Sequence, residues 1–381
     1  MVYVLGVDIC TPLADNINET LAAVKEKRSA LSLLSTIRGQ KLMQPVMGAL
    51  IQNHDVIGDY TFFESLCIQS ARKAIKLAKA DVRSSRCVFV LSSTKGDIWN
   101  PTAETARRIA NAFDNNTTPI VVSLACASGV SAQLTAFRLL ESGVYDTVVV
   151  IGCDVLIEFV VSGFQCVHAV SENPCRPFDI KRDGLNLGEA VGTMVLGIQL
   201  QAFHSSTFWQ LRGGSIHNDA NHISGPSKTA EGALRCLQDC IKILPNSDPM
   251  GDLACISVHG TATNYNDEME AVAIHRAGLD AVPVSALKGY WGHTMGAAGV
   301  VETILTMRAI DQGWIPAVLG FEEQGTTFAV NVSNQVRTTD KHSFIKLLSG
   351  FGGVNAALVW TKTAQQNIVH ETIGERKASL M

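Results

Sequence analysis

Two segments of this 381-residue sequence follow one plan, and this repeat constrains the fold more than any other feature. Residues 120–143 and residues 282–313 each begin with β-branched residues, pass through a loop into a cluster of small residues, and end in an amphipathic helical pattern closed by a glycine. Small residues before a helical pattern and a glycine after it are typical of helix starts and ends. An internal repeat of this kind indicates a duplicated unit. The sequence therefore predicts two related halves, residues 1–205 and residues 206–381.

Short apolar runs between the helical patterns indicate buried strands. Clear examples are residues 87–91, 147–151, 192–196 and 254–258. Strands of this length that alternate with helices predict an α/β fold. The first ten residues also form a strand pattern, and because no basic residue precedes their apolar stretch, we do not expect a secretion signal there.

Charge and cysteine usage argue against several classes of partner. The 31 basic and 35 acidic residues leave a net charge of −4, so bulk attraction to nucleic acid or to an anionic membrane is not expected. No apolar run reaches the roughly 18 residues that a membrane span needs. The ten cysteines form no paired C-x-x-C motifs, which indicates reduced thiols and predicts a cytoplasmic protein. Cys236 and Cys240 lie one helical turn apart, but no histidine cluster accompanies them, which favours core packing over a metal site.

Cys126 lies where an apolar run meets the small residues of the first repeat. At a helix N-terminus, unpaired amides and the helix dipole favour a thiolate, so the sequence predicts a lowered pKa for this thiol. Its small neighbours leave room for a substrate. The alternative is a buried, inert cysteine, and the local motif alone does not decide between the two. In the second repeat, His293 is expected at the place that Cys126 holds in the first.

Three other stretches carry chemically active side chains. The stretch ISVHGTATNYND, residues 256–267, places His259 at the exit of a predicted strand. KGYWGHTMGAAGVVE, residues 288–302, combines a lysine, a histidine and a glutamate with several glycines. LSGFGGVNAA, residues 348–357, surrounds Phe351 with glycines that can bring backbone amides close to a ligand. Taken singly, the first stretch is also typical of a structural histidine and the third of a plain tight turn, so each alone is a weak signal.

Together, the stretches resemble those of the β-ketoacyl-acyl carrier protein synthases of the elongating type, which share the thiolase fold. The resemblance extends from residue 1 to about residue 363 and includes LACASG, HGTAT, the K-x-x-x-x-H pair with GAAGVVE after it, GFGGVN, RPFDIKRDGLNLGEAVG at 176–192 and NDANHISGP at 218–226. It implies an α/β thiolase fold with a duplicated α-β-α-β-α layered architecture. The half that carries the cysteine would then precede the half that carries both histidines.

The resemblance also implies a role for individual residues. Cys126 matches the acyl-accepting nucleophile, and His259 and His293 match the pair that serves decarboxylation. Lys288 and Glu302 match the supporting charged residues. The implied reaction is the decarboxylative condensation of an acyl group on the cysteine with malonyl-acyl carrier protein, in fatty-acid, polyketide or polyene elongation.

Phe351 matches the gating phenylalanine, and its amide and that of Cys126 are expected to form the oxyanion hole. Thr261 and Thr263 match positions that line the phosphopantetheine arm of the carrier protein. The resemblance implies no metal and no redox cofactor. The implied partners are an acyl carrier protein and, in a homodimer or a heterodimer, either a second copy or a chain-length-type subunit.

The second histidine favours the elongating branch of the family, because the initiating branch has asparagine in place of one histidine and thiolases have a second cysteine. A non-catalytic chain-length subunit would lack the nucleophile, and Cys126 is present. The alternative is a partner or scaffold subunit of the same fold that has no condensing activity of its own.

The sequence departs from the family pattern at several positions. Leu185 replaces a phenylalanine, Asn264 replaces a proline, and the chain before Cys126 is shorter than usual. Tyr290 and Trp291 lie where small or polar residues are usual. We expect either that one ring packs under its loop while the other faces a partner subunit, or that Trp291 narrows the acyl tunnel in favour of a flat polyene chain. These departures indicate a specialised pathway.

Overall fold

The computed structural model describes residues 1–52, 54–198 and 207–364. Its main sheet has 11 strands in the order β13-β11-β10-β15-β16-β9-β1-β8-β6-β4-β5. The strands from the first part of the chain are β1 (Val2–Cys10), β4 (Cys87–Ser92), β5 (Ile120–Val122), β6 (Thr147–Asp154) and β8 (Ala190–Gly197). Those from the second part are β9 (Thr207–Asn218), β10 (Leu253–Ser257), β11 (Pro283–Ser285), β13 (Asn331–Val332), β15 (Ser343–Gly350) and β16 (Val354–Ala364). All four apolar runs predicted as strands, and the N-terminal one, are confirmed.

The two parts of the sheet repeat one topology. From the middle outward, β1-β8-β6-β4-β5 mirrors β9-β16-β15-β10-β11. In both sets the first three strands pair antiparallel, and the next two pairings are parallel. Strands β1 and β9 pair antiparallel and join the sets. The predicted duplication is therefore present, whereas the predicted boundary at residue 205 lies outside the described residues.

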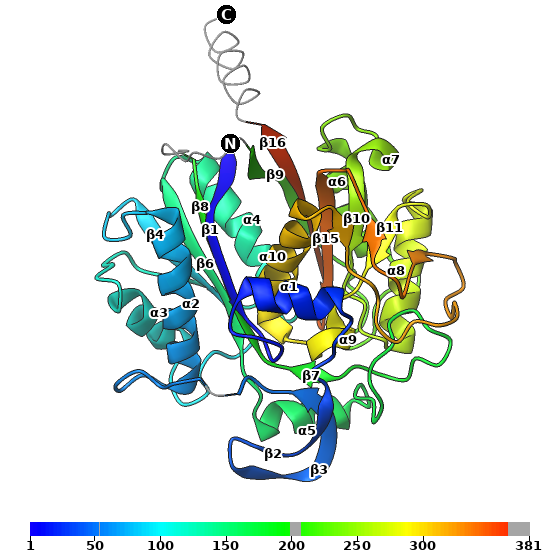
Figure 1. Cartoon of the computed structure of the whole chain (residues 1–381), viewed down its shortest axis with the longest axis horizontal. Helices are drawn as coiled ribbons and strands as arrows, with labels where there is room; N and C mark the ends of the chain where they lie inside the picture. Colours follow the sequence, from blue (N-terminus) through cyan, green and yellow to red (C-terminus); the bar gives the residue numbers. More distant parts are fainter. Residues whose placement is uncertain (53, 199–206, 365–381) are drawn as a thin grey trace, which may run out of the picture.

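Helices and strands form five layers (Figure 1). Helices α2 (Phe62–Ala78) and α3 (Thr102–Asn111) cover one outer face, and α6 (Glu231–Lys242) and α8 (Asn264–Arg276) cover the other. Helices α4 (Ser128–Glu141) and α10 (Ala298–Asp311) lie between the two parts of the sheet. Cys236 and Cys240 are buried in the core on α6, as predicted.

Shorter elements complete the described structure. A small sheet of β2, β3 and β7 lies near α5 at one end of the molecule (Figure 1). The full set of shorter elements is α1 (Ile17–Lys25), β2 (Ser32–Ile37), β3 (Gln40–Ala49), α5 (Glu158–Cys166), β7 (Leu187–Gly188), α7 (Pro249–Asp252), α9 (Lys288–Trp291), the 3-10 turn η1 (Met295–Ala297), β12 (Trp314–Ile315) and β14 (Arg337–Thr338).

The first turns of α4 and α10 touch through two glycines. A Cβ atom on Gly129 would lie 2.7 Å from the Cα atom of Gly299, and one on Gly299 would lie 2.4 Å from the amide nitrogen of Val130. Only residues without a side chain allow this approach. The contact brings the loop before each helix to one place, although the two loops are about half the sequence apart.

Candidate active site

Cys126 is presented by a tight turn between β5 and α4. Ala125, the residue before it, has a φ of 47°, in the left-handed region that non-glycine residues rarely adopt. The surrounding structure must hold this conformation, as is common at functional sites. The cysteine lies two residues before the first residue of α4 and is 7% exposed, with its sulfur at the wall of a cavity.

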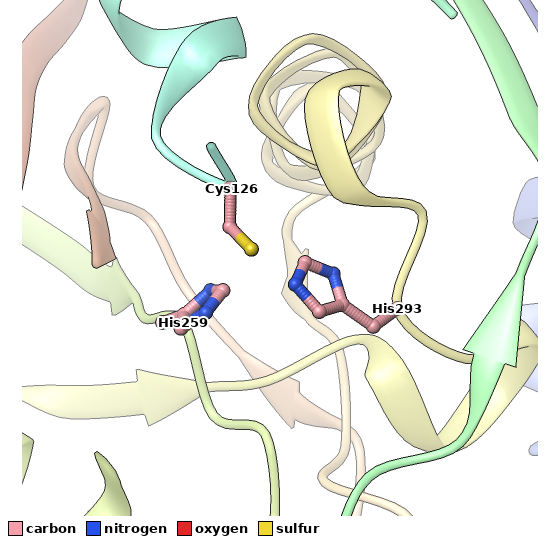
Figure 2. Close-up of side chains that lie close together, drawn as sticks. All are labelled: Cys126, His259 and His293. Carbon is pink, nitrogen blue, oxygen red and sulfur yellow. The ribbon is translucent and has the colours of Figure 1, made fainter. Parts of the chain in front are cut away.

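Two imidazoles face the sulfur from the other half of the chain (Figure 2). His259 follows β10, and His293 precedes η1. The sulfur and one ring nitrogen from each histidine lie within 4.8 Å of one another, and the ring centroids are 4.9 Å apart at an interplanar angle of 82°. Within the described part of the chain, this is the one group of three such side chains close enough to share a metal ion.

The predicted match between Cys126 and His293 in the two repeats is wrong. The cysteine lies two residues before its helix, whereas the histidine lies five residues before α10. The backbone identifies the true counterpart, because Met295 has a φ of 48°, like the residue before the cysteine. Gly296 is therefore the residue that corresponds to Cys126.

The predicted lowering of the Cys126 pKa is also wrong. Burial raises the pKa of this thiol to about 12, although the Lys288 ammonium and the backbone amides of Cys126 and Phe351 all act to lower it. Desolvation of the thiolate outweighs these contributions. The amides of Cys126 and Phe351 both stabilise negative charge at the sulfur, which is the property needed of the predicted oxyanion hole.

Hydrogen bonding assigns the tautomer of His293. Its Nδ1 atom accepts a hydrogen bond of 3.2 Å from the amide of Met295, so the ring proton lies on Nε2. Among the described residues, Nε2 has no hydrogen-bond partner, and neither has Nδ1 of His259. Burial lowers the pKa of both imidazoles well below its usual value, with a further contribution from Lys288. Both rings are therefore neutral near pH 7, and His293 offers a proton to the cavity.

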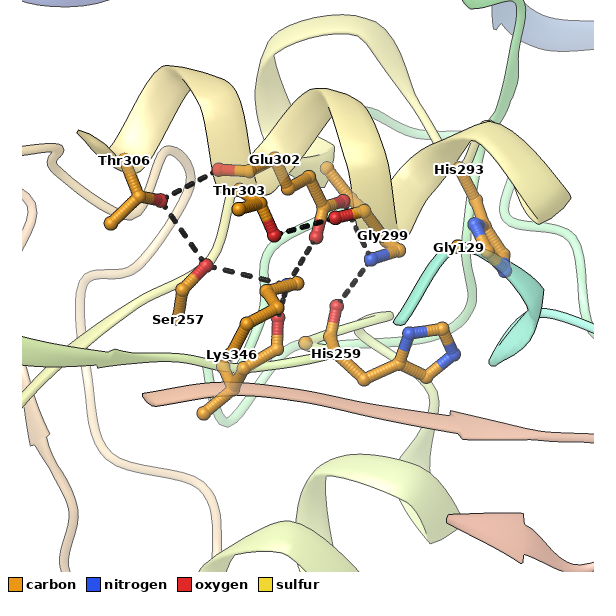
Figure 3. A network of polar contacts seen from close by, with 12 residues as sticks. Gly129, Ser257, His259, His293, Gly299, Glu302, Thr303, Thr306 and Lys346 are labelled. Atoms are coloured by element: carbon orange, nitrogen blue, oxygen red, sulfur yellow. Dashed lines mark hydrogen bonds and ion pairs between the residues drawn. The ribbon is translucent and has the colours of Figure 1, made fainter. Parts of the chain in front are cut away.

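A buried network of charges lies behind the histidines (Figure 3). Lys288 donates to the carbonyl oxygen of His259 at 2.6 Å and to the carboxylate of Glu302 at 2.9 Å. The other carboxylate oxygen accepts from Lys346 at 2.5 Å. Burial acts to raise the pKa of Glu302, but the two ammonium groups hold it below its usual value, so this carboxylate is ionised.

Sequence reasoning missed Lys346 and Glu270. The one signal for Lys346 is a single charged residue within the apolar run of β15, at a position whose neighbours are all buried. Glu270 accepts hydrogen bonds of 2.7 Å from the amides of His259 and Gly260, and it lies on α8, where its charge alone gives no sign of this contact.

The cavity beside these groups has a volume of about 400 Å³, and its wall includes Cys126 and both imidazoles. Thr261 and Thr263 also line it, with their hydroxyl oxygens 2.9 Å apart.

Phe351, which is 40% exposed, lines the cavity and packs against Phe164 with ring centroids 5.7 Å apart. Leu185 and Asn264, two of the departures from the family pattern, also lie in the wall. The structure thus brings every predicted contact residue to one cavity, with Lys288 and Glu302 behind it; the roles of these residues stay predictions.

Tyr290 and Trp291 do not line this cavity. Both side chains are 0% exposed within the single chain, and the hydroxyl of Tyr290 donates to the carbonyl of Ala317 at 3.0 Å. The expectation that one ring faces a partner subunit is therefore wrong. The alternative, in which Trp291 narrows the acyl tunnel, stays a prediction; its ring packs in the core and is absent from the wall of this cavity.

Comparison with known families agrees with this geometry. Residues 61–202 match the model of the β-ketoacyl synthase N-terminal domain, and residues 210–322 match that of the C-terminal domain. The chain belongs to the β-ketoacyl synthase family. Cys126 falls within the matched N-terminal segment, and His259 and His293 fall within the matched C-terminal segment.

Curated members of the family are similar over part of their length. The chain is 32% identical to 3-oxoacyl-(acyl-carrier-protein) synthase 2 of Rhizobium meliloti over 252 residues, which cover 62% of this chain and 59% of that protein. It is 30% identical to the mitochondrial 3-oxoacyl-(acyl-carrier-protein) synthase of Arabidopsis thaliana over 261 residues, which cover 62% of this chain and 54% of that protein. The chain thus spans less than two thirds of these relatives.

Solved structures confirm the fold. A β-ketoacyl synthase from Burkholderia phymatum matches with a TM-score of 0.85 at 22% identity, covering 95% of this chain and 99% of that one. A ketosynthase in complex with its chain length factor from Xenorhabdus doucetiae matches with a TM-score of 0.82 at 22% identity, covering 95% of this chain and 98% of that one. The predicted thiolase fold with duplicated layers is therefore present. Among the described helices, none is long and apolar enough to cross a membrane.

Proposed function

We propose that this β-ketoacyl synthase is an elongating condensing enzyme that acts on carrier-bound thioesters. The observation that supports this proposal most directly is the meeting of Cys126, two backbone amides and two neutral imidazoles at one cavity. Cys126 can act as the nucleophile, the two amides as hydrogen-bond donors to one oxyanion, and the two imidazoles as donors to a second. Two successive reactions at thioester carbonyls need these groups.

In the first reaction, the sulfur of Cys126 attacks the thioester of an acyl-carrier protein. The oxygen that becomes negative faces the amides of Cys126 and Phe351, and one such donor contributes about 3–4 kcal/mol to the transition state. The acyl group stays on the cysteine, and the thiol proton passes to the sulfur of the departing carrier. Because burial keeps the resting thiol protonated, this proton must leave during the attack.

In the second reaction, malonyl-carrier protein loses carbon dioxide and forms an enolate. The enolate oxygen accepts hydrogen bonds from His259 and His293, and the carbon attacks the acyl carbonyl on Cys126. A carbon–carbon bond forms, and the cysteine leaves as a thiolate that takes a proton from water. Lys288 and Glu302 act as positioning residues, since Lys288 holds the backbone carbonyl of His259.

The partners follow from this chemistry. We propose that Thr261 and Thr263 contact the phosphopantetheine arm of an acyl carrier protein, because their hydroxyls line the same cavity. The reaction uses no metal and no redox cofactor. We propose a homodimer, or a heterodimer with a chain-length-type subunit, in fatty-acid, polyketide or polyene elongation. The Xenorhabdus doucetiae ketosynthase forms a complex with its chain length factor, which supports the heterodimer.

Acyl loading tests the proposal against a scaffold function. The protein is mixed with carrier protein that bears an octanoyl or a sorbyl group, and its intact mass is measured. An enzyme gains one acyl group, which the Cys126→Ser variant does not gain, because an unassisted hydroxyl is a poor nucleophile. Cys166→Ser, a change at an exposed cysteine, serves as the control and should load normally. A wild-type chain that gains no acyl group from either donor and releases no carbon dioxide from malonyl-carrier protein would be a scaffold.

A further inference from the structure

Lys346 is a second buried cation beneath the two histidines. Its side chain is 0% exposed, and its Nζ atom donates to Ser257 Oγ at 3.3 Å, to the carbonyl of Val258 at 3.0 Å and to Glu302 at 2.5 Å (Figure 3). An ammonium group has three protons, and here each proton has one acceptor. Burial lowers the pKa of Lys346, but the Glu302 carboxylate opposes this effect. The geometry is that of a charged lysine.

The network contains more positive than negative charge. Glu302 is the one ionised carboxylate in contact with either Lys288 or Lys346 in the described structure. Other charged or titratable groups lie near the histidines: Cys126, Asp183, Asp219, His222 and Tyr265 line the same cavity, Glu270 and Asp267 accept from the amides of residues 259–261, Asp154 with its partner Lys95 accepts from Gly296, and Cys175 lies near Lys288. Burial raises the pKa of Glu270 to about 7 and also raises that of Asp267. Among the groups in direct ion-pair contact, two lysines thus share the one carboxylate of Glu302.

Stability does not explain this excess. Lys288 alone can neutralise Glu302, and a second buried cation adds a desolvation cost of several kcal/mol. The contacts of Lys346 point to the active site instead. It holds the carbonyl of Val258, while Lys288 holds the carbonyl of His259, so the two cations fix consecutive peptide groups of the strand end that carries the imidazole.

We propose that Lys346 is a positioning residue that keeps His259 and His293 neutral and favours the negative charge of the enolate. This inference rests on the proposed condensation, because the enolate forms in that reaction. A positive charge near an imidazole disfavours its protonation, and the same charge stabilises an anion in the cavity. Protonation of His293 on Nδ1 would also break the bond from the Met295 amide, so keeping this ring neutral preserves the loop.

Histidine titration tests the electrostatic part without any assumption about activity. The imidazole carbons are labelled with carbon-13, and their pKa values are measured by NMR in the wild type and in Lys346→Met. Removing the cation makes protonation easier, so the pKa values of His259 and His293 should rise by about one unit or more. The control is Lys362→Met, which removes a 21% exposed lysine paired with Asp311 at 2.8 Å and should leave both values unchanged. Unchanged values in Lys346→Met would overturn the inference.

The pH profile of malonyl-carrier decarboxylation tests the functional part. In Lys346→Met, the acidic limb should move to higher pH, and the rate at neutral pH should fall by about tenfold. The rate at which iodoacetamide alkylates Cys126 should stay unchanged, because Lys288 is the lysine whose charge acts on that sulfur. Equal losses of alkylation and decarboxylation would indicate a structural role and would overturn the inference.

The two proposals can fail separately. If the wild type does not decarboxylate malonyl-carrier protein but its histidines titrate as expected, the condensing function fails and the electrostatic role of Lys346 stands. If decarboxylation is normal in both forms, the inference about Lys346 fails alone. Should Lys346→Met not fold, Lys346→Gln keeps a donor to Glu302 without the charge, and the same two measurements apply to it.

Discussion

The turn before α4 and the turn before α10 have the same backbone and different chemistry. Ala125 and Met295 adopt nearly equal left-handed φ angles of 47° and 48°. In the first turn, the amide of Cys126 stabilises charge at its own sulfur, facing the cavity. In the second, the amide of Gly296 donates to the carboxylate of Asp154 at 2.7 Å. Duplication thus produced two turns that bind negative charge, and a protein carboxylate permanently occupies one of them.

The linkers that lead into these turns differ in length. Two residues, 123 and 124, join β5 to the first turn, whereas residues 286–294 join β11 to the second. The longer linker contains α9 and carries both Lys288 and His293. In the proposed mechanism, the first copy supplies the nucleophile, and the extended linker of the second copy supplies His293 as a donor to the enolate and Lys288 as a positioning residue.

Replacing Cys126 by glycine makes the first turn resemble the second, and we expect this change to have the largest effect on activity. Cys126→Gly should lower acyl loading by at least about 10³-fold, as loss of a nucleophile does in other acyl-transfer enzymes. Release of carbon dioxide from malonyl-carrier protein should continue, because the imidazoles come from the other copy. Intact-mass analysis measures loading, and a carbon dioxide assay measures decarboxylation. Loss of decarboxylation in a folded variant would show that the two copies do not divide the chemistry in this way.

The carboxylate in the second turn is the next feature to change. The carboxylate of Asp154 accepts hydrogen bonds from Gly296, Thr94 and Ser93. It also forms an ion pair with Lys95 at 3.0 Å. Asp154→Asn leaves the lysine unpaired and puts an amide group against several donors. We expect a loss of about 3–5 kcal/mol in the free energy of unfolding, measured in urea.

The matched control is Asp146→Asn, which removes an ion pair between Asp146 and Arg86 at the surface. Solvent screens such an exposed pair, so this variant should lose much less stability than Asp154→Asn. Equal losses in the two variants would mean that the buried carboxylate does not hold the second turn in place.

Local patterns in the sequence predict the strands, the repeat and the residues of the cavity. The small residues around Gly129 and Gly299 indicate helix starts, but the contact between these two helix starts is a finding of the structure alone. The pKa of Cys126 could not be predicted in this way, since the helix terminus is a local feature whereas burial depends on the whole fold. The contact of Lys346 with the active-site network could not be predicted for the same reason, because its partner Glu302 lies 44 residues away in the chain.

The smallest effect is expected from adding one methyl group to the second turn. A Cβ atom on Gly296 would lie 2.7 Å from the Cα atom of Ser93 and 2.8 Å from a carboxylate oxygen of Asp154. The first contact is with backbone, so the turn must shift, and Gly296→Ala should lower the free energy of unfolding by about 1–3 kcal/mol. Cys126 carries a larger side chain at the corresponding place without strain, because a cavity lies in front of it.

Gly163→Ala is the control, since a Cβ atom there has no neighbour within 4 Å and the residue lies in α5. Alanine is favoured over glycine in a helix, so this variant should be as stable as the wild type or more stable by up to about 1 kcal/mol. Gly296→Ala should also slow decarboxylation more than acyl loading, because the shift reaches Met295 and, through its amide, the ring of His293. If loading fell and decarboxylation did not, the second turn would be supporting the cysteine instead of the histidine, and the division of labour between the two turns would have to be reversed.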